Sequence, residues 1–273
     1  MRILRTIAVT FAQYSRIPMP RFDWKEEDMT YSMSVFPWVG AVIGLIYTAV
    51  YLLCCRFGVP ETAAALLMTA VPVLITGGFH IDGFMDVSDA LSSYGSREEK
   101  LRILKDPHIG AFAVIRLVLA GLIFTSSVMT IVSLGAGPLY GSAAGQMNLP
   151  VFNTALGFAV SRGFSAVSVL NFRSAKKEGM LYCESTSAGA GRKGNLVFVA
   201  VWITIASGLM LYIDLISGAA EIAAALCTFA WYRHLSYREF GGITGDTAGW
   251  FVTVCETAVM AAAALSAVIM QQL

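Results

Sequence analysis

The sequence predicts an all-α integral membrane protein, a helix bundle that crosses the bilayer several times. Of the 273 residues, 56 % are apolar and only 14 % are charged, whereas soluble domains carry roughly 25 % charged residues. The mean hydropathy is +0.67. No low-complexity linker divides the chain, so we expect residues 1–273 to form a single membrane-embedded domain.

About seven stretches are long and apolar enough for transmembrane helices, since a helix needs roughly 20 apolar residues to cross a bilayer. A further apolar stretch, residues 3–19, is interrupted by Arg5, Gln13 and Arg16. We expect it to lie on the membrane as an interfacial or re-entrant element. The expected spans, of which the sixth is the weakest, are 33–53, 61–79, 109–134, 150–170, 195–216, 219–236 and 247–271.

Positive charges are concentrated in alternate loops of this arrangement. Loops 80–108, 171–194 and 233–246 are rich in Lys and Arg, whereas loop 135–149 has no charged residue and Arg56 is the single exception on that side. The positive-inside rule assigns basic loops to the cytoplasm. A site in these loops would therefore face cytoplasmic, water-soluble substrates.

Three aspartates share one face of a predicted helix within the first basic loop. Asp82, Asp86 and Asp89 are spaced at i, i+4 and i+7, which brings them close to one line along a helix. Three carboxylates on one stripe repel each other unless a cation joins them, and Mg²⁺ prefers such ligands and often bridges to substrate phosphates. The stripe predicts metal-dependent phosphoryl transfer; solvated acids at a helix end are the alternative.

Small residues and one histidine flank the aspartates. Gly77, Gly78 and Gly83 lack a Cβ, which would let a phosphate or a metal ion approach the backbone closely. His80 is a candidate ligand or base, and a structural histidine at a helix end is the alternative.

Four basic residues are candidates for phosphate contacts. Lys105 would bind phosphate while Asp106 joins the metal site, unless Asp106 only caps the third span. Arg162 lies inside the fourth span and needs a partner, for which a phosphate or one of the aspartates would serve. Arg173 and Lys177 lie in the second basic loop, where ordinary solvated charge is the alternative.

A glycine-rich turn, residues 241–249, precedes the last span. Its four glycines and two threonines surround Asp246, a composition typical of a tight turn that faces phosphate or metal. A simple helix entry capped by Asp246 or Thr247 is the alternative. Glu256 lies deeper in the same span, and a carboxylate inside a membrane is a functional candidate because it is costly to bury.

These motifs resemble, in order, those of the cobalamin synthase family, the adenosylcobinamide-GDP ribazoletransferases. Residues 77–89 resemble the family's GG-x-H-x-DG-x-x-D-x-x-D signature, and residues 105–110 look like its K-D-S-R-I-G motif. Thr253 stands where the family usually has Glu. Further matches extend over essentially the whole chain, at 16–20, 161–163, 177–179 and 241–249.

The resemblance implies an enzyme of the last steps of cobalamin biosynthesis in the bacterial cytoplasmic (inner) membrane. Such an enzyme joins adenosylcobinamide-GDP to α-ribazole or to its 5′-phosphate: a ribose hydroxyl attacks, GMP leaves, and adenosylcobalamin or its 5′-phosphate forms. Mg²⁺ is the expected cofactor. The partners are these small molecules and the lipid bilayer, without nucleic acid, and a homo-oligomer is left open.

On this basis each motif receives a role. Asp82, Asp86 and Asp106 are expected to hold the metal. Asp89 is expected to take the hydroxyl proton, with His80 as the alternative and Asp246 as a further catalytic residue. The expected substrate-binding residues are Lys105, Arg162, Arg173, Lys177, Gly77, Gly78 and Gly83.

Two other functions compete with this one. Lipid-forming CDP-alcohol phosphotransferases also place aspartates on membrane helices, but they show D-G-x-x-A-R, and no Ala-Arg follows Asp82-Gly83 at that position. A cation transporter could use Asp82, Asp86 and Asp246 as an ion path. The glycine turns and clustered cations favour a phosphate enzyme over a transporter.

Overall fold

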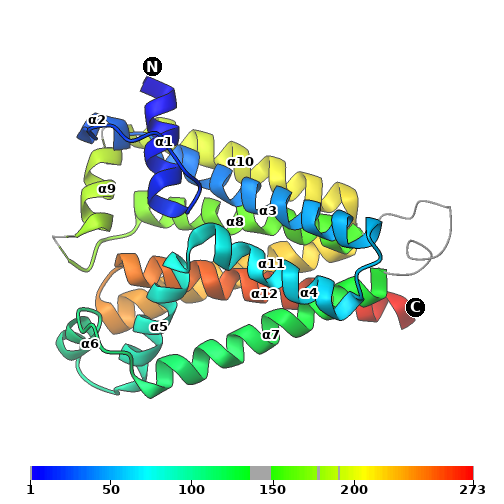
Figure 1. The fold of residues 1–273 in the computed structure, drawn as a ribbon. Helices are drawn as coiled ribbons and strands as arrows, with labels where there is room; N and C mark the ends of the chain where they lie inside the picture. The colour runs from blue at the N-terminus through cyan, green and yellow to red at the C-terminus, as the bar shows by residue number, and fades with distance from the viewer. Residues whose placement is uncertain (1, 136–148, 177–178, 190, 273) are drawn as a thin grey trace.

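In the computed structural model, which describes residues 2–135, 149–176, 179–189 and 191–272, long helices run along one axis and short helices gather at one end of the bundle (Figure 1). No strand occurs in those ranges, so the predicted all-α fold is confirmed. The long helices are α3 (Ser32–Arg56), α4 (Glu61–Thr76), α7 (Ala111–Gly135), α8 (Leu149–Asn171), α10 (Arg192–Ile213), α11 (Leu215–Leu235) and α12 (Gly245–Gln272). The short ones are α1 (Arg2–Tyr14), α2 (Glu26–Met29), α5 (Phe79–Ser92), α6 (Arg97–Ile103), α9 (Met180–Gly189) and a π-helical turn, Ser236–Phe240.

The expected count of about seven membrane spans is not confirmed. Within the described residues, α3, α7, α10, α11 and α12 are long and apolar enough to cross a membrane, which makes five, or six if α4 and α5 count as one bent span. The remaining long helix, α8, is more polar because it carries residues such as Asn153 and Arg162, both of them fully buried. It packs against α3, α10 and α12, which shield these groups from the lipid-facing wall.

The expected span 61–79 ends earlier than predicted. Helix α4 stops at Thr76 because Gly77 and Gly78 both adopt the left-handed conformation, with φ of 65° and 82°, which glycine reaches without a Cβ penalty. Helix α5 then leaves at 91° to α4. The aspartate stripe therefore runs across the end of the bundle instead of along its axis (Figure 1).

Close packing of two glycines fixes the position of α8. A Cβ on Gly40 or Gly44 of α3 would lie 2.1 Å from the backbone oxygen of Phe158 or Ala155. The two backbones are therefore in direct contact, a geometry that only small residues allow in membrane helices. This contact fixes how deep in the bundle Arg162 of α8 lies.

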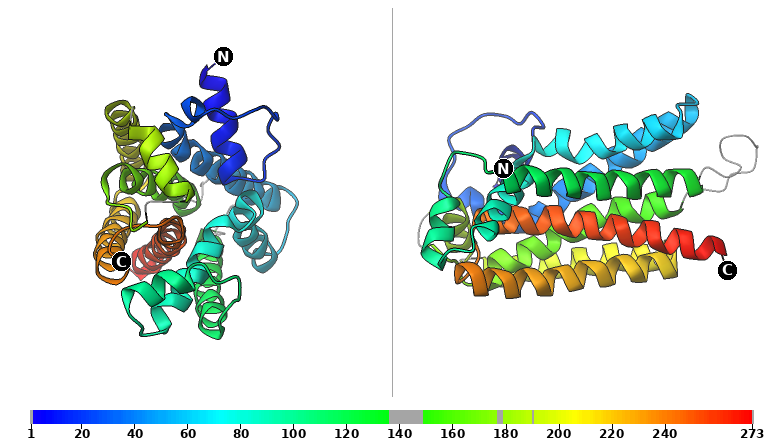
Figure 2. Two further views of the ribbon diagram at one scale, coloured as in Figure 1. Left: turned by 90° about the vertical axis from the view of Figure 1, so that its left-hand side faces the viewer. Right: turned by 90° about the horizontal axis from the view of Figure 1, so that it is seen from below.

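The three basic segments meet at one end of the bundle, which Figure 2 (left) shows face on. Lys100 of α6 forms a 2.5 Å ion pair with Glu239 in the π-helical turn. The segment before α9 joins the segment before α12 through a single parallel bridge between Ser174 and Ile243. The expected interfacial stretch 3–19 forms helix α1 here, and its inner face packs against α3.

Candidate active site

Helices α5 and α12 cross so closely that their aspartates share one cavity. A Cβ on Gly83 would lie 2.7 Å from the backbone oxygen of Asp246, and a Cβ on Gly249 would lie 3.2 Å from the backbone oxygen of His80. Because glycine occupies both positions, Asp82 and Asp246 line the same cavity, here called the acidic cavity. The structure thus gives Gly83 a role in helix packing, and its predicted contact with substrate stays a prediction.

Among the described residues, one basic side chain lines the acidic cavity together with the carboxylates. Lys176, from the segment between α8 and α9, lines it together with Asp82 and Asp246, and its positive charge acts on the Asp246 carboxylate. The sequence predicts that its neighbour Lys177 binds substrate, and Lys177 lies outside the described residues. The remaining lining residues are Phe79, Gly83, Ser174, Gly179, Leu181, Tyr182, Thr244 and Gly245.

The carboxylates repel one another across the helix crossing. The negative charges of Asp82, Asp246 and Asp89 all act on the half-buried Asp86. Among the described residues no three His, Cys, Asp or Glu side chains are arranged to hold a metal ion. Mg²⁺ is commonly held by one or two carboxylates together with substrate phosphates, so the donor set around Asp86 suits such an ion.

The start of α12 is fixed by two threonines rather than by Asp246. The Thr244 N–H donates to the Thr247 hydroxyl at 2.8 Å, and the Thr247 N–H donates to the Thr244 hydroxyl at 3.1 Å. This reciprocal pairing satisfies the helix end as a capping box does. The Asp246 carboxylate is therefore not needed as a cap, and it accepts a hydrogen bond, 3.3 Å long, from the Thr244 hydroxyl.

Several predicted site residues lie apart from the acidic cavity. The Asp106 carboxylate is exposed, lies 2.6 Å from the His108 ring nitrogen and accepts from the His108 N–H, which lowers the pKa of Asp106. Asp106 is not among the charges that act on Asp86. Lys105 is exposed on the same loop. The expected contribution of Asp106 to a metal site with Asp82 and Asp86 stays a prediction.

Arg173 is engaged with the backbone of the glycine-rich turn. Its guanidinium donates to the carbonyl oxygen of Gly241 at 2.7 and 3.2 Å. This contact ties the segment before α9 to the segment before α12 and so supports the wall that carries Lys176. The predicted phosphate contact of Arg173 stays a prediction.

The buried Arg162 finds its partner on α12. It forms an ion pair with Glu256 and also donates to the Phe158 carbonyl oxygen at 3.0 Å. A charged side chain in a membrane protein needs such a partner. The sequence predicts a phosphate or an aspartate as this partner, whereas in the structure the partner is Glu256. Thr253, one turn earlier, donates to the backbone oxygen of His80 at 3.2 Å.

His80 points away from the aspartate stripe. Its buried ring lies 5.5 Å from the Phe79 ring, 5.9 Å from the Phe36 ring and 6.4 Å from the Tyr14 ring, measured between centroids. Neither ring nitrogen has a hydrogen-bond partner among the described residues. The imidazole therefore forms a wall between two cavities of the bundle and does not line the acidic cavity.

Gly77 and Gly78 form the turn between α4 and α5. A Cβ on Gly77 would lie 2.3 Å from the Nε atom of Arg16, and the Arg16 N–H donates to the carbonyl oxygen of Ile75 at 2.7 Å. Both glycines line a cavity that also reaches Asp82. Their predicted contact with substrate stays a prediction.

Sequence reasoning missed one buried carboxylate close to the site. Glu184 of α9 accepts hydrogen bonds from Tyr14 and Gln13 of α1. Burial raises the pKa of Glu184 to about 7, although both hydrogen bonds lower it. No motif marks this residue, because its partners lie about 170 positions earlier in the chain.

Comparison with known proteins identifies the family. Residues 6–264 match the family described as cobalamin-5-phosphate synthase. The chain belongs to this family. No solved structure matches it.

Members of the cobalamin-5-phosphate synthase family with curated names resemble this chain over nearly its whole length. A relative named adenosylcobinamide-GDP ribazoletransferase, from Lachnoclostridium phytofermentans, is 35 % identical over 94 % of this chain and 92 % of its own length. A relative of the same name from Geotalea daltonii is 33 % identical over 90 % of this chain and 92 % of its own. A third relative of the same name, from Pseudomonas savastanoi, is 32 % identical over 92 % of this chain and 93 % of its own length.

Proposed function

We propose that this protein joins adenosylcobinamide-GDP to α-ribazole, or to α-ribazole 5′-phosphate, and releases GMP. The observation that carries the proposal is the acidic cavity, which Asp82, Asp246 and Lys176 line together, in a chain of the cobalamin-5-phosphate synthase family. Phosphoryl transfer depends mainly on positioning and on neutralising the charge of phosphate oxygens. Family membership favours this reaction over lipid synthesis and over cation transport.

The ammonium group and the carboxylates that line the acidic cavity have separate roles in this reaction. The Lys176 ammonium binds the pyrophosphate of the nucleotide substrate, because it is the cation that lines the cavity. A carboxylate beside the metal ligands, Asp89 as expected from the sequence or Asp246, accepts the proton of the attacking ribose hydroxyl, a form of help typically worth about 10²–10⁴ in rate. The ribose oxygen bonds to the phosphorus that carries cobinamide while the bond from that phosphorus to the bridging pyrophosphate oxygen breaks, and GMP leaves with the bridging oxygen on its own phosphate.

Mg²⁺ is the proposed cofactor, and one or two of the carboxylates of Asp82, Asp86 and Asp246 would hold it together with the substrate phosphates. The mutual repulsion of these carboxylates supports a divalent cation at this position. Bound there, Mg²⁺ would neutralise charge on the pyrophosphate oxygens.

We infer that the acidic cavity faces the cytoplasm of a bacterial cell. The basic segments that contain Arg97, Lys100, Arg173 and Arg238 meet at the end of the bundle where the cavity lies (Figure 1). The opposite end carries Arg56. The positive-inside rule assigns the basic end to the cytoplasm, where the soluble substrates are found.

A defined assay tests the proposed function. The full chain, purified in detergent, is incubated with adenosylcobinamide-GDP and α-ribazole in the presence of Mg²⁺ or of EDTA. We expect GMP and the corrinoid product to form in equal amounts, only when α-ribazole and Mg²⁺ are both present. Release of GMP without α-ribazole, or no release at all, would contradict the proposal.

A further inference from the structure

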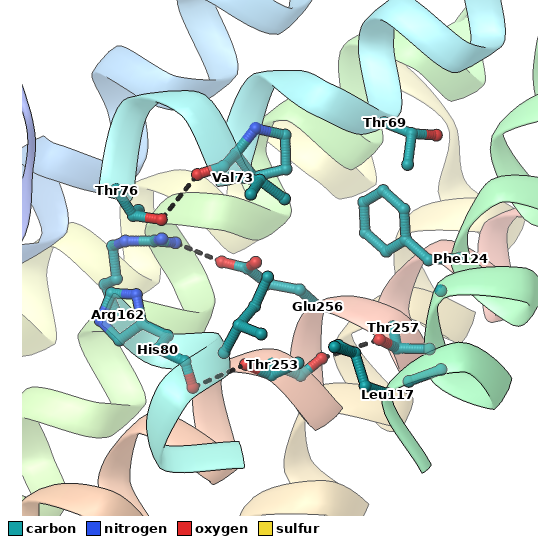
Figure 3. A pocket seen from close by; sticks show the side chains of 14 residues that line it. Thr69, Val73, Thr76, His80, Leu117, Phe124, Arg162, Thr253, Glu256 and Thr257 are labelled. Carbon is teal, nitrogen blue, oxygen red and sulfur yellow. Dashed lines mark hydrogen bonds and ion pairs between the residues drawn. The ribbon is translucent and has the colours of Figure 1, made fainter. Parts of the chain in front are cut away.

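A second cavity lies between α4, α7 and α12, apart from the acidic cavity (Figure 3). The empty space between its walls is roughly 610 Å³ when the part open to the outside is included, and its walls are mostly apolar. Val73 and Gly121 line it and are exposed on the outer wall of the bundle. We call it the lateral cavity; its apolar lining includes Pro72, Val73, Ile81, Leu117, Ala120 and Phe124.

The inner end of the lateral cavity is polar and incompletely hydrogen bonded. Figure 3 shows the Arg162–Glu256 ion pair there, with Phe124 on the far side of the cavity. The Nε and Nη2 atoms of the fully buried Arg162 have no hydrogen-bond partner among the described residues, and the same holds for both ring nitrogens of His80. Buried polar atoms without partners are costly. The two Arg162 atoms and one nitrogen of a neutral His80 ring are donors, so a ligand that accepts their hydrogen bonds would be stabilised.

The charge at this inner end selects the kind of ligand. Arg162 and Glu256 neutralise each other, so a carboxylate or a phosphate would bring an uncompensated charge into a low-dielectric site. A neutral group with an apolar body and one or two acceptor atoms satisfies the free donors without that cost. A flat heteroaromatic ring with a ring nitrogen is such a group, and Phe124 offers it an aromatic neighbour.

The lateral cavity adjoins the reacting groups. Thr76 and Ile81 line it and also line the cavity at the α4–α5 turn, which contains Asp82. Asp82 in turn lines the acidic cavity. A ligand that fills the lateral cavity therefore contacts Thr76 and Ile81, which also line the cavity that contains Asp82.

We propose that the lateral cavity binds the neutral heteroaromatic base of the acceptor nucleoside and thereby directs its ribose hydroxyl toward Asp82. This inference rests on the proposed function and adds to it a separate subsite for the acceptor base, remote from the pyrophosphate subsite at Lys176. The base enters past Thr76 and Ile81, and its ring nitrogen accepts a hydrogen bond from Arg162.

A pair of glycine substitutions tests the subsite. A Cβ on Gly121 meets no atom within 4 Å, and the same is true of Gly208, which is exposed on α10 away from the cavity. Gly121→Phe should therefore fill the lateral cavity without a backbone clash, and Gly208→Phe is the matched control. We expect Gly121→Phe to raise KM for α-ribazole by about tenfold while KM for adenosylcobinamide-GDP is unchanged, and Gly208→Phe to change neither.

Binding of α-ribazole by calorimetry, in detergent and without the second substrate, separates the outcomes. Weaker binding by Gly121→Phe but not by Gly208→Phe supports the subsite. If the wild-type protein catalyses the reaction and Gly121→Phe leaves KM for α-ribazole unchanged, the base binds elsewhere and the lateral cavity belongs to lipid chains. If the wild-type protein neither binds α-ribazole nor releases GMP, the proposed function itself is wrong.

Discussion

Gly83 of α5 lies directly against the backbone of Asp246 at the start of α12, and this contact brings two distant aspartates into one cavity. A Cβ at position 83 would meet the Asp246 oxygen at 2.7 Å and its Cα at 2.9 Å. Both atoms belong to the backbone, so a side chain at this position can be accommodated only if one helix shifts. The contact predicts that the smallest possible substitution at Gly83 disturbs the active site.

Gly83→Ala should separate α5 from α12 and lower turnover. Overpacking of this kind typically costs about 1–3 kcal/mol, and a shift of the helices also changes the distance between Asp82 and Asp246. The check is kcat together with the inactivation temperature in detergent. Gly208→Ala is the control, because a Cβ there meets no atom within 4 Å; equal activity of the two variants would show that the crossing tolerates a methyl group.

Replacing single carboxylates of the acidic group should abolish turnover without unfolding the protein. Asp82→Asn, Asp86→Asn and Asp246→Asn keep the side-chain shape but remove the charge on which metal binding and proton transfer depend. We expect kcat to fall by at least about 10² in each, while gel-filtration profiles in detergent stay unchanged. Asp23→Asn, at an exposed position, is the control, and near-normal turnover in the three variants would exclude the acidic cavity as the active site.

Removing only the acidic partner of the Arg162–Glu256 pair should lower the stability of the protein, and removing both charges should restore most of it. Glu256→Gln leaves the fully buried Arg162 without its anion, and removing one partner of a buried pair typically costs about 3–5 kcal/mol. Arg162→Met combined with Glu256→Gln removes both charges and should recover most of the loss. Inactivation temperatures of the single and double variants check this, and Thr253→Val should be mild because it removes only hydroxyl contacts.

Because the pKa of Glu184 is raised, we expect the packing of α1 against α9 to weaken as the pH rises. Its pKa is raised from 4.5 to about 7 in the folded protein, so the folded state binds the extra proton between these two values. Stability is then highest below about pH 4.5 and is lost as the pH rises toward about 7. Glu184→Gln should flatten this dependence of the inactivation temperature, whereas an unchanged slope would show that another group titrates.

The arrangement of basic segments predicts the orientation in the membrane. In a variant without the five native cysteines, a cysteine at Ser96, beside α6, should resist impermeant reagents added from outside the cell. A cysteine at Glu61, at the opposite end of the bundle, should react. The reverse pattern would put the acidic cavity on the outer side of the membrane.

The sequence determined the helices and the family, because both depend on local patterns. Apolar stretches of about 20 residues are sufficient to predict the long helices, and the spacing of Asp82, Asp86 and Asp89 is by itself enough to place them on one helix face. The ordered motifs were specific enough to indicate the family to which the chain belongs. These features need no knowledge of how the helices pack.

Only the tertiary structure decided which side chains meet. Lys176 lines the acidic cavity because the Ser174–Ile243 bridge fixes its segment against the start of α12. The stripe lies across the bundle end because α5 leaves α4 at 91°. Arg162 meets Glu256 across 94 positions of sequence, a pairing that depends on the depth at which α8 and α12 pack, and no local pattern of residues specifies that depth.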